Sequence, residues 1–407
     1  MDKLKILVCP ANEGGCAYYR AWSPFAKLAE KFPDLVEVKF NMNPLGIDTS
    51  SGKWQDNWDF EDMKWCDVIM TQNISNWGGE YTSRIVGKAK EFGKFVHYDT
   101  DDLLTDLYEG HRLRDVYKEK GLSEMTKFIY HHADLVTVTQ RKFAQRIQQY
   151  CGKVLAVVKN SVDYTLECWN HPKVPPRKKG LVRIGWAGGI HHEEDVKEFA
   201  GIPHFVNQRV GRENVEWHFF GKPPKTDEAT DEWQQDVWKN YQNTLLKGFK
   251  GERNYFIHNA LSTDSYGFIF SMMDIAIAPL QMNDFNDSKS EIKVAECGRY
   301  KVPLVASNVG CYDESIINGK TGYLIEPDAP KAEWVKILTK VIRDKKHREA
   351  MGESLHELTE QYFDLNKVVD QRLNLYKDTF ELLGREDLAE KLWDIGSLEV
   401  TPPTQLS

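Results

Sequence analysis

Short apolar runs alternate with longer amphipathic stretches along the whole chain, and this alternation constrains the fold more than any other feature. In the first half, such runs occupy Leu4–Pro10, Cys66–Gln72, Lys94–Asp99 and Ala133–Gln140, each flanked by polar residues. The pattern restarts in the second half at Leu181–Gly189. Runs of this length predict β-strands, and strands that alternate with helices predict parallel sheets with helices on both faces. We therefore expect an α/β protein built from doubly wound sheets.

A Pro- and Lys-rich segment separates the two series of strands and predicts a linker over 171–180. The chain has 407 residues, which suits two domains of the usual size. We expect one Rossmann-like domain over 1–170 and another over 181–344, each with ligand-binding loops at the carboxyl ends of its strands. Apolar residues at helical spacing predict helices over 345–395, and the end of the chain, 396–407, is expected to be a frayed tail.

The charge and cysteine content argue against several classes of protein. Lys and Arg number 53 against 61 Asp and Glu, a net charge of −8, whereas proteins that grip nucleic acid broadly carry clustered positive charge. The seven cysteines are scattered and form no CxxC pair, so we expect a reducing, cytoplasmic location and neither a disulfide framework nor a zinc site. No run of about 18 apolar residues indicates a membrane span, and the first apolar run is too short for the core of a signal peptide.

The most specific chemistry lies in the segment DSKSEIKVAECGRYKVPLVAS, residues 287–307. Ser288 and Glu291 have the S-x-x-E spacing of a capping box, which predicts that a helix begins at Ser288. This helix start would lie at the carboxyl edge of the second sheet. Backbone N–H groups and the positive end of the helix dipole favour an anion there.

Three charged residues of this predicted helix, Lys289, Lys293 and Glu296, would share one face because they are spaced four and three residues apart. Two ammonium groups near a helix start suit a diphosphate, and a carboxylate further along suits the hydroxyls of a ribose. The alternative is a solvated helix face on which charge pairs form at this same spacing.

A glycine turn, GGCAYYR, follows the first strand and places Gly14 and Gly15 where backbone N–H groups can approach a phosphate. The turn lacks the GxGxxG spacing, so it does not indicate a dinucleotide site. Arg20 would either contact a phosphate or form an ion pair on the surface.

Three carboxylates lie close together in HYDTDDLL, at Asp99, Asp101 and Asp102, where another predicted strand ends. Such a group can act as a base for an acceptor hydroxyl or hold a divalent metal through oxygen ligands. The alternative is structural, with Asp99 or Asp101 capping the helix that follows.

In the second half, GGIHHEED places Gly188, His191 and His192 in the turn after a strand, and Lys222 follows the next strand. Adjacent histidines without an HExxH pattern do not indicate zinc. One histidine would contact a phosphate or a sugar, unless both merely belong to the start of a helix. Lys222 would reach a diphosphate or lie on the surface.

These segments resemble the donor-sugar half of glycosyltransferases with the GT-B fold, and most nearly glycosyltransferase family 4. That family carries a Glu, seven residues, a second Glu, and then a Gly-x-Pro turn into an apolar strand. Glu296 and the run Val302–Leu304 match the second half of this pattern, whereas the first Glu position falls on Ser288. Lys289 and Ser290 resemble the Lys-Ser pair that a subset of these enzymes carries at the helix start. The resemblance covers most of the chain.

The resemblance implies two Rossmann-like domains that face each other across a cleft, with helices over 345–395 packing back on the first domain. It also implies a retaining glycosyltransferase that moves a sugar from a nucleoside-diphosphate sugar, a UDP-sugar above all, to a hydroxyl of a glycan or lipid-linked glycan, with no required metal. The residues expected to carry catalysis are Asp99, Asp101 and Lys289. The residues expected to bind the donor are Gly14, Gly15, Gly188, His191, Lys222, Ser288, Lys289, Ser290, Lys293 and Glu296, with Glu296 on the ribose.

Other functions stay open at this point. Some viral GT-B enzymes transfer sugar to hydroxymethylated DNA bases, but the net charge of −8 disfavours DNA as a partner. The absence of the first Glu leaves open a GT-B nucleotide-binding protein without activity. A sugar-nucleotide epimerase of similar shape is a weaker alternative.

Overall fold

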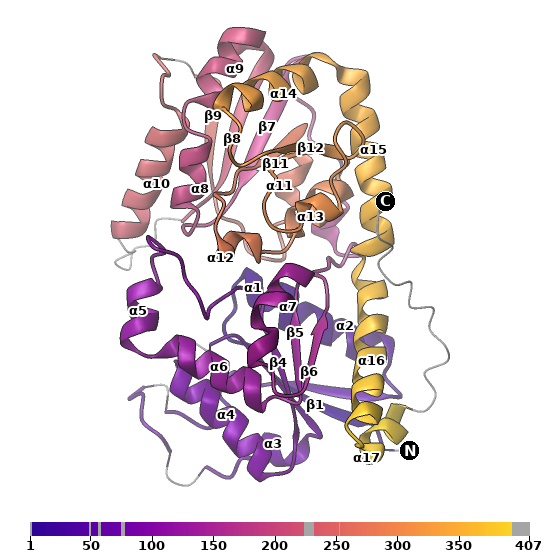
Figure 1. Ribbon diagram of the computed structural model, residues 1–407. Coiled ribbons are helices and arrows are strands. Elements are labelled where there is room, and N and C mark those ends of the chain that lie inside the picture. The colour runs from indigo at the N-terminus through magenta and orange to yellow at the C-terminus, as the bar shows by residue number, and fades with distance from the viewer. Residues whose placement is uncertain are drawn as a thin grey trace. The chain divides into compact units, whose positions relative to one another are not determined.

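The computed structural model describes residues 2–48, 50–55, 58–74, 78–223, 232–251 and 253–392 of the 407-residue chain. The chain divides into two compact units, and Figure 1 follows it through both. The first unit comprises 1–162, 288–290 and 363–407, and the second comprises 163–287 and 291–362.

The first unit contains a six-stranded parallel sheet in the order β2-β1-β3-β4-β5-β6. Its strands are β1 (Leu4–Cys9), β2 (Val36–Phe40), β3 (Val68–Gln72), β4 (Phe95–Asp99), β5 (Leu135–Val138) and β6 (Val154–Val157). Every residue of β3 and β4 is buried, as continuous apolar runs predict for strands covered on both faces. The strand order reverses at β1, so the loop after β1 lies at the point where ligands bind in such sheets.

Helices pack on both faces of this sheet (Figure 1). The longest is α16 (Leu365–Leu382), which buries one stripe of side chains against the sheet at a spacing of three or four residues: Leu365, Val369, Leu373, Tyr376 and Phe380. The other α-helices of the unit are α1 (Gly15–Ala17), α2 (Ser23–Lys31), α3 (Glu61–Trp65), α4 (Gly79–Glu91), α5 (Arg114–Glu119), α6 (Leu122–His132), α7 (Arg141–Ile147) and α17 (Glu386–Ala389). A single π-helical turn over Tyr18–Trp22 joins α1 to α2.

The second unit has its own six-stranded parallel sheet, in the order β12-β11-β10-β7-β8-β9. Its strands are β7 (Val182–Ala187), β8 (Val215–Lys222), β9 (Tyr255–Asn259), β10 (Ile275–Ala278), β11 (Leu304–Ser307) and β12 (Gly322–Ile325). The order reverses between β7 and β10, which makes the loops after these two strands the switch point of this sheet.

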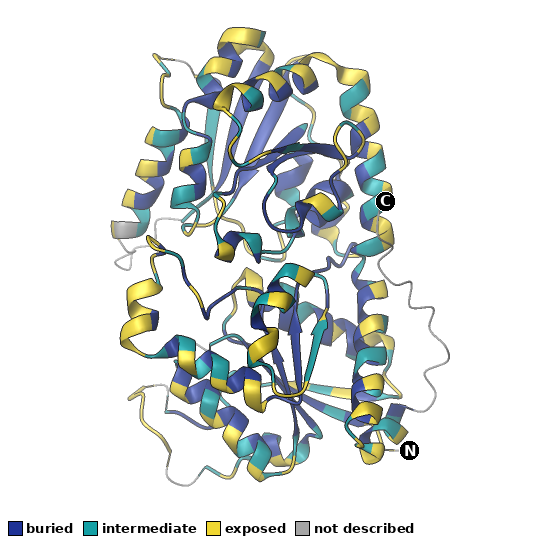
Figure 2. Ribbon diagram, in the orientation of Figure 1, coloured by how far each residue is buried: buried dark blue, intermediate teal, exposed yellow. Residues whose placement is uncertain are grey.

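The helices of the second unit are amphipathic, and Figure 2 shows them buried on one side and exposed on the other. They are α8 (Glu193–Glu198), α9 (Ile202–Val210), α10 (Glu232–Leu245), α11 (Phe268–Ser271), α12 (Asp284–Asp287), α13 (Ile292–Arg299), α14 (Lys331–Arg343) and α15 (Lys345–Tyr362). Trp217 of β8, Phe199 and Trp334 of α14 meet in the core between sheet and helices. None of the described helices in either unit is long and apolar enough to cross a membrane.

The division of the chain differs from the predicted domain boundaries in two places. Residues 163–170 and α15 group with the second unit, so the chain returns to the first unit at Phe363 and not at residue 345. Close packing of α15 on α13 explains the difference: a Cβ on Gly298 of α13 would lie 2.3 Å from Cγ2 of Thr359 in α15. The predicted tail, 396–407, lies outside the described residues.

Candidate functional site

The glycine turns at Gly188 and Gly221 contact each other at the carboxyl edge of the second sheet. The N–H of Gly188, after β7, donates to the carbonyl of Phe220 in β8 at 3.1 Å. Gly221 has a φ of +120°, and a Cβ there would lie 2.0 Å from the carbonyl oxygen of Gly188, so only glycine fits. This contact holds the end of β8, where Lys222 is the last residue, beside the Gly188 turn.

A buried carboxylate links the loops on the two sides of the switch point. Asp195 of α8, only 3% exposed, accepts from the backbone N–H of Gln281 and from Nδ2 of Asn286, both at 2.8 Å. Its other oxygen accepts from Nδ1 of His192 at 2.7 Å. His192 thus contacts Asp195, whereas His191, the histidine expected to bind the donor, is exposed.

The helix of the 287–307 segment begins later than predicted. α13 begins at Ile292, with Glu291 at the N-cap position, so the capping box at Ser288 was wrong. The reason is that Glu291 is buried and its carboxylate accepts from the Sγ of Cys311. Ser288, Lys289 and Ser290 therefore lie between α12 and α13, outside both helices, and Ser288 is fully buried.

Lys293 and Glu296 form an ion pair on α13. Nζ of Lys293 lies 2.6 Å from Oε2 of Glu296 and 2.7 Å from the hydroxyl of Tyr266. Burial by itself would lower the pKa of Lys293, but the charge of Glu296 and the Tyr266 hydroxyl outweigh it and raise this pKa above its usual value. The pair has the spacing of the predicted charge pairs, yet Glu296 is 1% exposed, so the face is not solvated.

Lys289 and Ser290 group with the first unit, where a cluster of acids follows β4. Ser290 accepts from Nδ2 of Asn160 at 2.8 Å. Limited access to solvent and the neighbouring charge of Asp101 raise the pKa of Asp102 to about 7, while the positive charge of Lys289 opposes this rise. Lys289 is thus an electrostatic partner of Asp102.

Cys16 completes this cluster. Its Sγ and one oxygen each of Asp101 and Asp102 all lie within 4.8 Å of one another, a spacing that could hold a metal ion. The charge of Asp101 raises the pKa of the Cys16 thiol well above its usual value. Nδ2 of Asn73 donates to Oδ1 of Asp101 at 2.9 Å and holds that carboxylate in place.

Asp99 has a different environment from its two neighbours. It is fully buried, and Nε and Nη2 of Arg20 lie 2.7 Å from its two carboxylate oxygens. Thr137 donates to the same carboxylate at 2.5 Å. Arg20 is also fully buried, so it does not form the surface ion pair that was one of its two expected roles. Asp99 or Asp101 was expected to address the acceptor; Arg20 holds the carboxylate of Asp99, whereas Asn73 holds that of Asp101.

The glycine turn after β1 begins the helix α1, and both of its glycines are exposed. The N–H of Gly14 donates to Oδ1 of Asn12 at 2.7 Å, so this predicted phosphate donor already has an acceptor. Gly15 has open space where a side chain would be, which leaves room for a ligand at this position.

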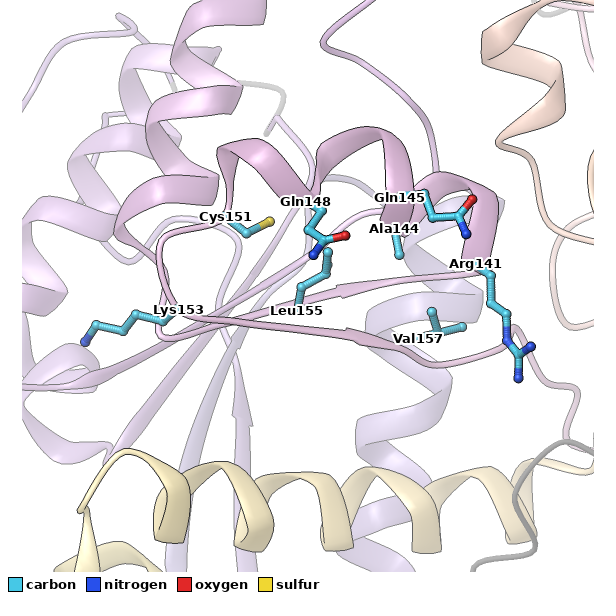
Figure 3. A pocket seen from close by; sticks show the side chains of 8 residues that line it. All are labelled: Arg141, Ala144, Gln145, Gln148, Cys151, Lys153, Leu155 and Val157. Atoms are coloured by element: carbon cyan, nitrogen blue, oxygen red, sulfur yellow. The ribbon is translucent and has the colours of Figure 1, made fainter.

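A groove of about 540 Å³ lies apart from all the predicted site residues, between α7 and the edge strand β6 of the first sheet (Figure 3). Its lining consists of Arg141, Ala144, Gln145, Gln148, Cys151, Lys153, Leu155 and Val157. Lys153 already pairs with Asp134 at 2.6 Å. Among the described residues, the groove brings together no pair of acid and base that indicates chemistry.

Sequence reasoning missed Asp195, Asn286 and Asn160, which hold the candidate binding residues in place. The spacing of His192 and Asp195, three residues apart at a helix start, was a signal that could have identified Asp195. Nothing comparable marked Asn160, because its contact with Ser290 joins residues 130 positions apart.

Comparison with known proteins agrees with this architecture. Residues 239–357 match the family model of the glycosyl transferases group 1. Sucrose-phosphate synthase from Thermosynechococcus elongatus has a TM-score of 0.66, at 11% identity over 94% of this chain and 100% of that chain. HepE from Anabaena has a TM-score of 0.59, at 14% identity over 92% and 100%. TarM from S. aureus has a TM-score of 0.54, at 13% identity over 76% and 55%. No curated protein sequence matches the chain.

The two parallel sheets and these likenesses define a protein of the GT-B fold. The chain carries a glycosyl transferases group 1 domain over 239–357 and is a glycosyltransferase. The predicted fold class and the predicted resemblance to GT-B glycosyltransferases are confirmed. The matched region contains β10, α13 and β11, and with them Lys293 and Glu296.

Proposed function

We propose that this chain transfers a sugar from a UDP-sugar to a hydroxyl of a glycan or lipid-linked glycan, with retention of configuration at the anomeric carbon. The observation that carries the proposal is the family match over 239–357, which includes the buried pair of Lys293 and Glu296. Structures of HepE are described in complex with UDP, with UDP-glucose, and with UDP and glucose. A structure of a TarM mutant is described in complex with UDP, fondaparinux and alpha-GlcNAc-glycerol.

On the donor side, we assign the ribose hydroxyls to Glu296, whose carboxylate Lys293 holds in place. Lys222, at the end of β8, and the backbone of Gly188, after β7, are assigned to the diphosphate. Lys289 is assigned to the negative charge that develops on the departing diphosphate. Fixed positive charge of this kind is often the largest contribution to such catalysis, so the proposal includes no required metal.

On the acceptor side, we assign Asp101 and Asp102 to the acceptor hydroxyl. A carboxylate whose pKa is about 7 can take up a proton at neutral pH, which suits Asp102 for this role. We assign Asp99 a positioning role only, because it is buried and both of its carboxylate oxygens accept hydrogen bonds from Arg20.

A transfer assay tests the proposal. The enzyme is incubated with UDP-glucose, UDP-N-acetylglucosamine or UDP-galactose and a panel of glycan acceptors, and UDP release and product are measured with and without EDTA. We expect UDP release that depends on acceptor, survives EDTA and gives a product with the donor's anomeric configuration. Release that EDTA abolishes would contradict the metal-free mechanism, and an inverted product would contradict retention. Absence of release with every donor, including GDP- and ADP-sugars, would contradict the proposed activity.

A further inference from the structure

Asn73 is the first residue after β3 and connects the end of that strand with the loop that follows β4. Its backbone N–H donates to the carbonyl of Asp99 at 3.0 Å. Its side chain reaches further along the same loop, where Nδ2 donates to Oδ1 of Asp101 at 2.9 Å. An ionised carboxylate only accepts hydrogen bonds, so the amide must present Nδ2 to Asp101 and turn Oδ1 away from it. One residue thus fixes both the backbone that leaves β4 and the orientation of the Asp101 carboxylate.

The conformation of Asn73 is costly to the fold in two ways. Its backbone has a φ of +47°, in the left-handed region that non-glycine residues seldom adopt, although asparagine tolerates it better than most. Its Oδ1 is buried and, within the part of the chain that the structure describes, has no hydrogen-bond partner. A buried acceptor without a donor lowers stability, and strained residues of this kind cluster where function requires their geometry. The stability of the fold therefore does not account for Asn73.

Asn41 makes the same kind of contact without these costs. It also follows a strand, β2, and its Nδ2 donates to a carboxylate oxygen of Asp62 at 2.9 Å. Its Oδ1 accepts from the backbone N–H of Asn43 at 2.8 Å, so both ends of this amide have partners. Its backbone is not left-handed. Asn41 is thus an amide that stabilises a turn, and comparison with it isolates what is particular to Asn73.

We propose that Asn73 is a positioning residue for sugar transfer, which holds the carboxylate of Asp101 in the orientation that meets the acceptor hydroxyl. This inference rests on the proposed function, because it takes from it the assignment of Asp101 to the acceptor. The amide occupies Oδ1 of Asp101 and thereby sets the direction in which Oδ2 points. Because Oδ1 of Asn73 is enclosed, this residue does not touch the substrate itself and acts through Asp101.

The test compares Asn73→Gly, Asn73→Asp and the control Asn41→Gly in the full chain. Transfer from the UDP-sugar to the best acceptor of the panel is followed with enzyme in excess over donor, so that slow variants stay measurable. Thermal unfolding and UDP affinity are measured on the same samples.

We expect Asn73→Gly to lower the transfer rate about ten- to a hundredfold, the range expected when a reacting group is misplaced. Its unfolding midpoint should stay within a few degrees of the wild type, because glycine adopts the left-handed conformation freely and removes the enclosed oxygen. Asn73→Asp keeps the size of the side chain but cannot donate when ionised, so it should not restore the rate. Asn41→Gly should do the reverse and lower the midpoint while the rate stays at the wild-type value. UDP affinity should be unchanged in all three variants.

A second background shows whether the effect passes through Asp101. Asp101→Ala removes the carboxylate that Asn73 orients, so Asn73→Gly should change the rate by less than about twofold in that background. A wild-type rate in Asn73→Gly, or an equal loss with and without Asp101, overturns the inference and leaves the proposed function intact. A loss of rate that accompanies a fall in midpoint as large as that of Asn41→Gly indicates a merely structural role and overturns it too. A wild-type protein that transfers no sugar to any acceptor overturns the proposed function as well.

Discussion

Arg20 and Asp99 form a two-point ion pair in the interior of the first unit, with Nε and Nη2 each 2.7 Å from a carboxylate oxygen. Arg372 of α16 lies 3.6 Å from the same carboxylate, and its neighbour Tyr376 shares a hydrogen bond with His97 of β4 at 2.7 Å. This network joins β4 to the helix with which the chain returns to the first unit. Asp99 therefore contributes to stability and holds in place the start of the loop that follows β4.

Replacing Asp99 is expected to destabilise the protein strongly. Asp99→Asn leaves the buried charges of Arg20 and Arg372 without a carboxylate, and loss of one partner of a buried pair lowers the free energy of unfolding by about 3–5 kcal/mol. Urea unfolding at pH 7 measures this change. Glu80→Gln, which removes the exposed pair with Arg84, serves as the control and should change stability by about 0.5 kcal/mol or less. Equal effects of the two substitutions would contradict the structural role of Asp99.

The contribution of Asp99 should also depend on pH. Burial by itself would raise the pKa of this carboxyl, but the charges of Arg20 and Arg372 outweigh burial and hold the pKa below its ordinary value of 3.8. The stabilisation is present above pH 3.8 and is lost as the pH falls through the lower folded pKa. The difference in unfolding free energy between wild type and Asp99→Asn should be level near neutral pH and shrink in acid. A difference that stays level at the lowest pH at which the protein folds would refute this assignment.

The contribution of Asp102 to the free energy of unfolding should show the opposite dependence on pH. Its pKa is raised from 3.8 to about 7, so the unfolded chain releases this proton more readily than the folded protein does. The stabilisation that the neutral carboxyl of Asp102 contributes is fully present below pH 3.8 and is lost as the pH rises to about 7. Asp102→Asn should therefore stabilise the protein by an amount that grows over this interval and then levels off. The transfer rate of the wild type should rise with pH around 7, and the variant should lack this rise if Asp102 accepts the proton.

Removal of Glu296 should affect both binding and folding. Glu296→Ala leaves Lys293 largely enclosed without its carboxylate, and because Lys293 is still 21% exposed we expect a loss of about 2–3 kcal/mol in unfolding free energy. Glu296→Gln keeps the shape and should cost less stability, while both variants bind UDP weakly because the ribose partner is lost. Glu333→Ala is the control, since it breaks an exposed pair with Lys336 at the same spacing of three residues. Normal UDP affinity in Glu296→Gln, measured by calorimetry, would remove the ribose assignment.

Lys289 should matter for turnover more than for donor binding. Lys289→Ala removes the charge assigned to the departing diphosphate, so we expect kcat to fall about 100-fold, the size of effect seen when one such stabilising group is removed. UDP affinity should change by less than kcat does. Lys320→Ala, at an exposed lysine, should leave turnover unchanged. Turnover by Lys289→Ala that matches this control would contradict the assignment.

Strands and the long helices were predictable because their signal lies in neighbouring residues. The apolar run predicted from Leu4 corresponds to β1, which ends one residue earlier at Cys9. Likewise, apolar residues at helical spacing in the return helix, such as Leu373 and Phe380, are those that α16 buries.

Features that depend on long-range contacts were not predictable from the sequence. The S-x-x-E pattern does not mark a helix start at Ser288, because the carboxylate of Glu291 accepts a hydrogen bond from Cys311, twenty residues further on. Asp99 and Asp101 look equivalent in the sequence, yet it is Asp99 that accepts hydrogen bonds from Arg20, seventy-nine residues away. Such pairings require the folded structure, since no local spacing encodes them.

The most direct test of the account is thermal unfolding of the wild type and Glu296→Gln with UDP, GDP, ADP, CDP and dTDP, each with and without EDTA. A nucleotide at about a hundred times its dissociation constant adds about 2.7 kcal/mol to stability, which appears as a rise of several degrees in the midpoint. We predict that UDP raises the midpoint of the wild type, that EDTA does not alter this rise, and that Glu296→Gln reduces it. Absence of a shift with all five nucleotides would contradict the proposal that this chain binds a nucleoside-diphosphate sugar.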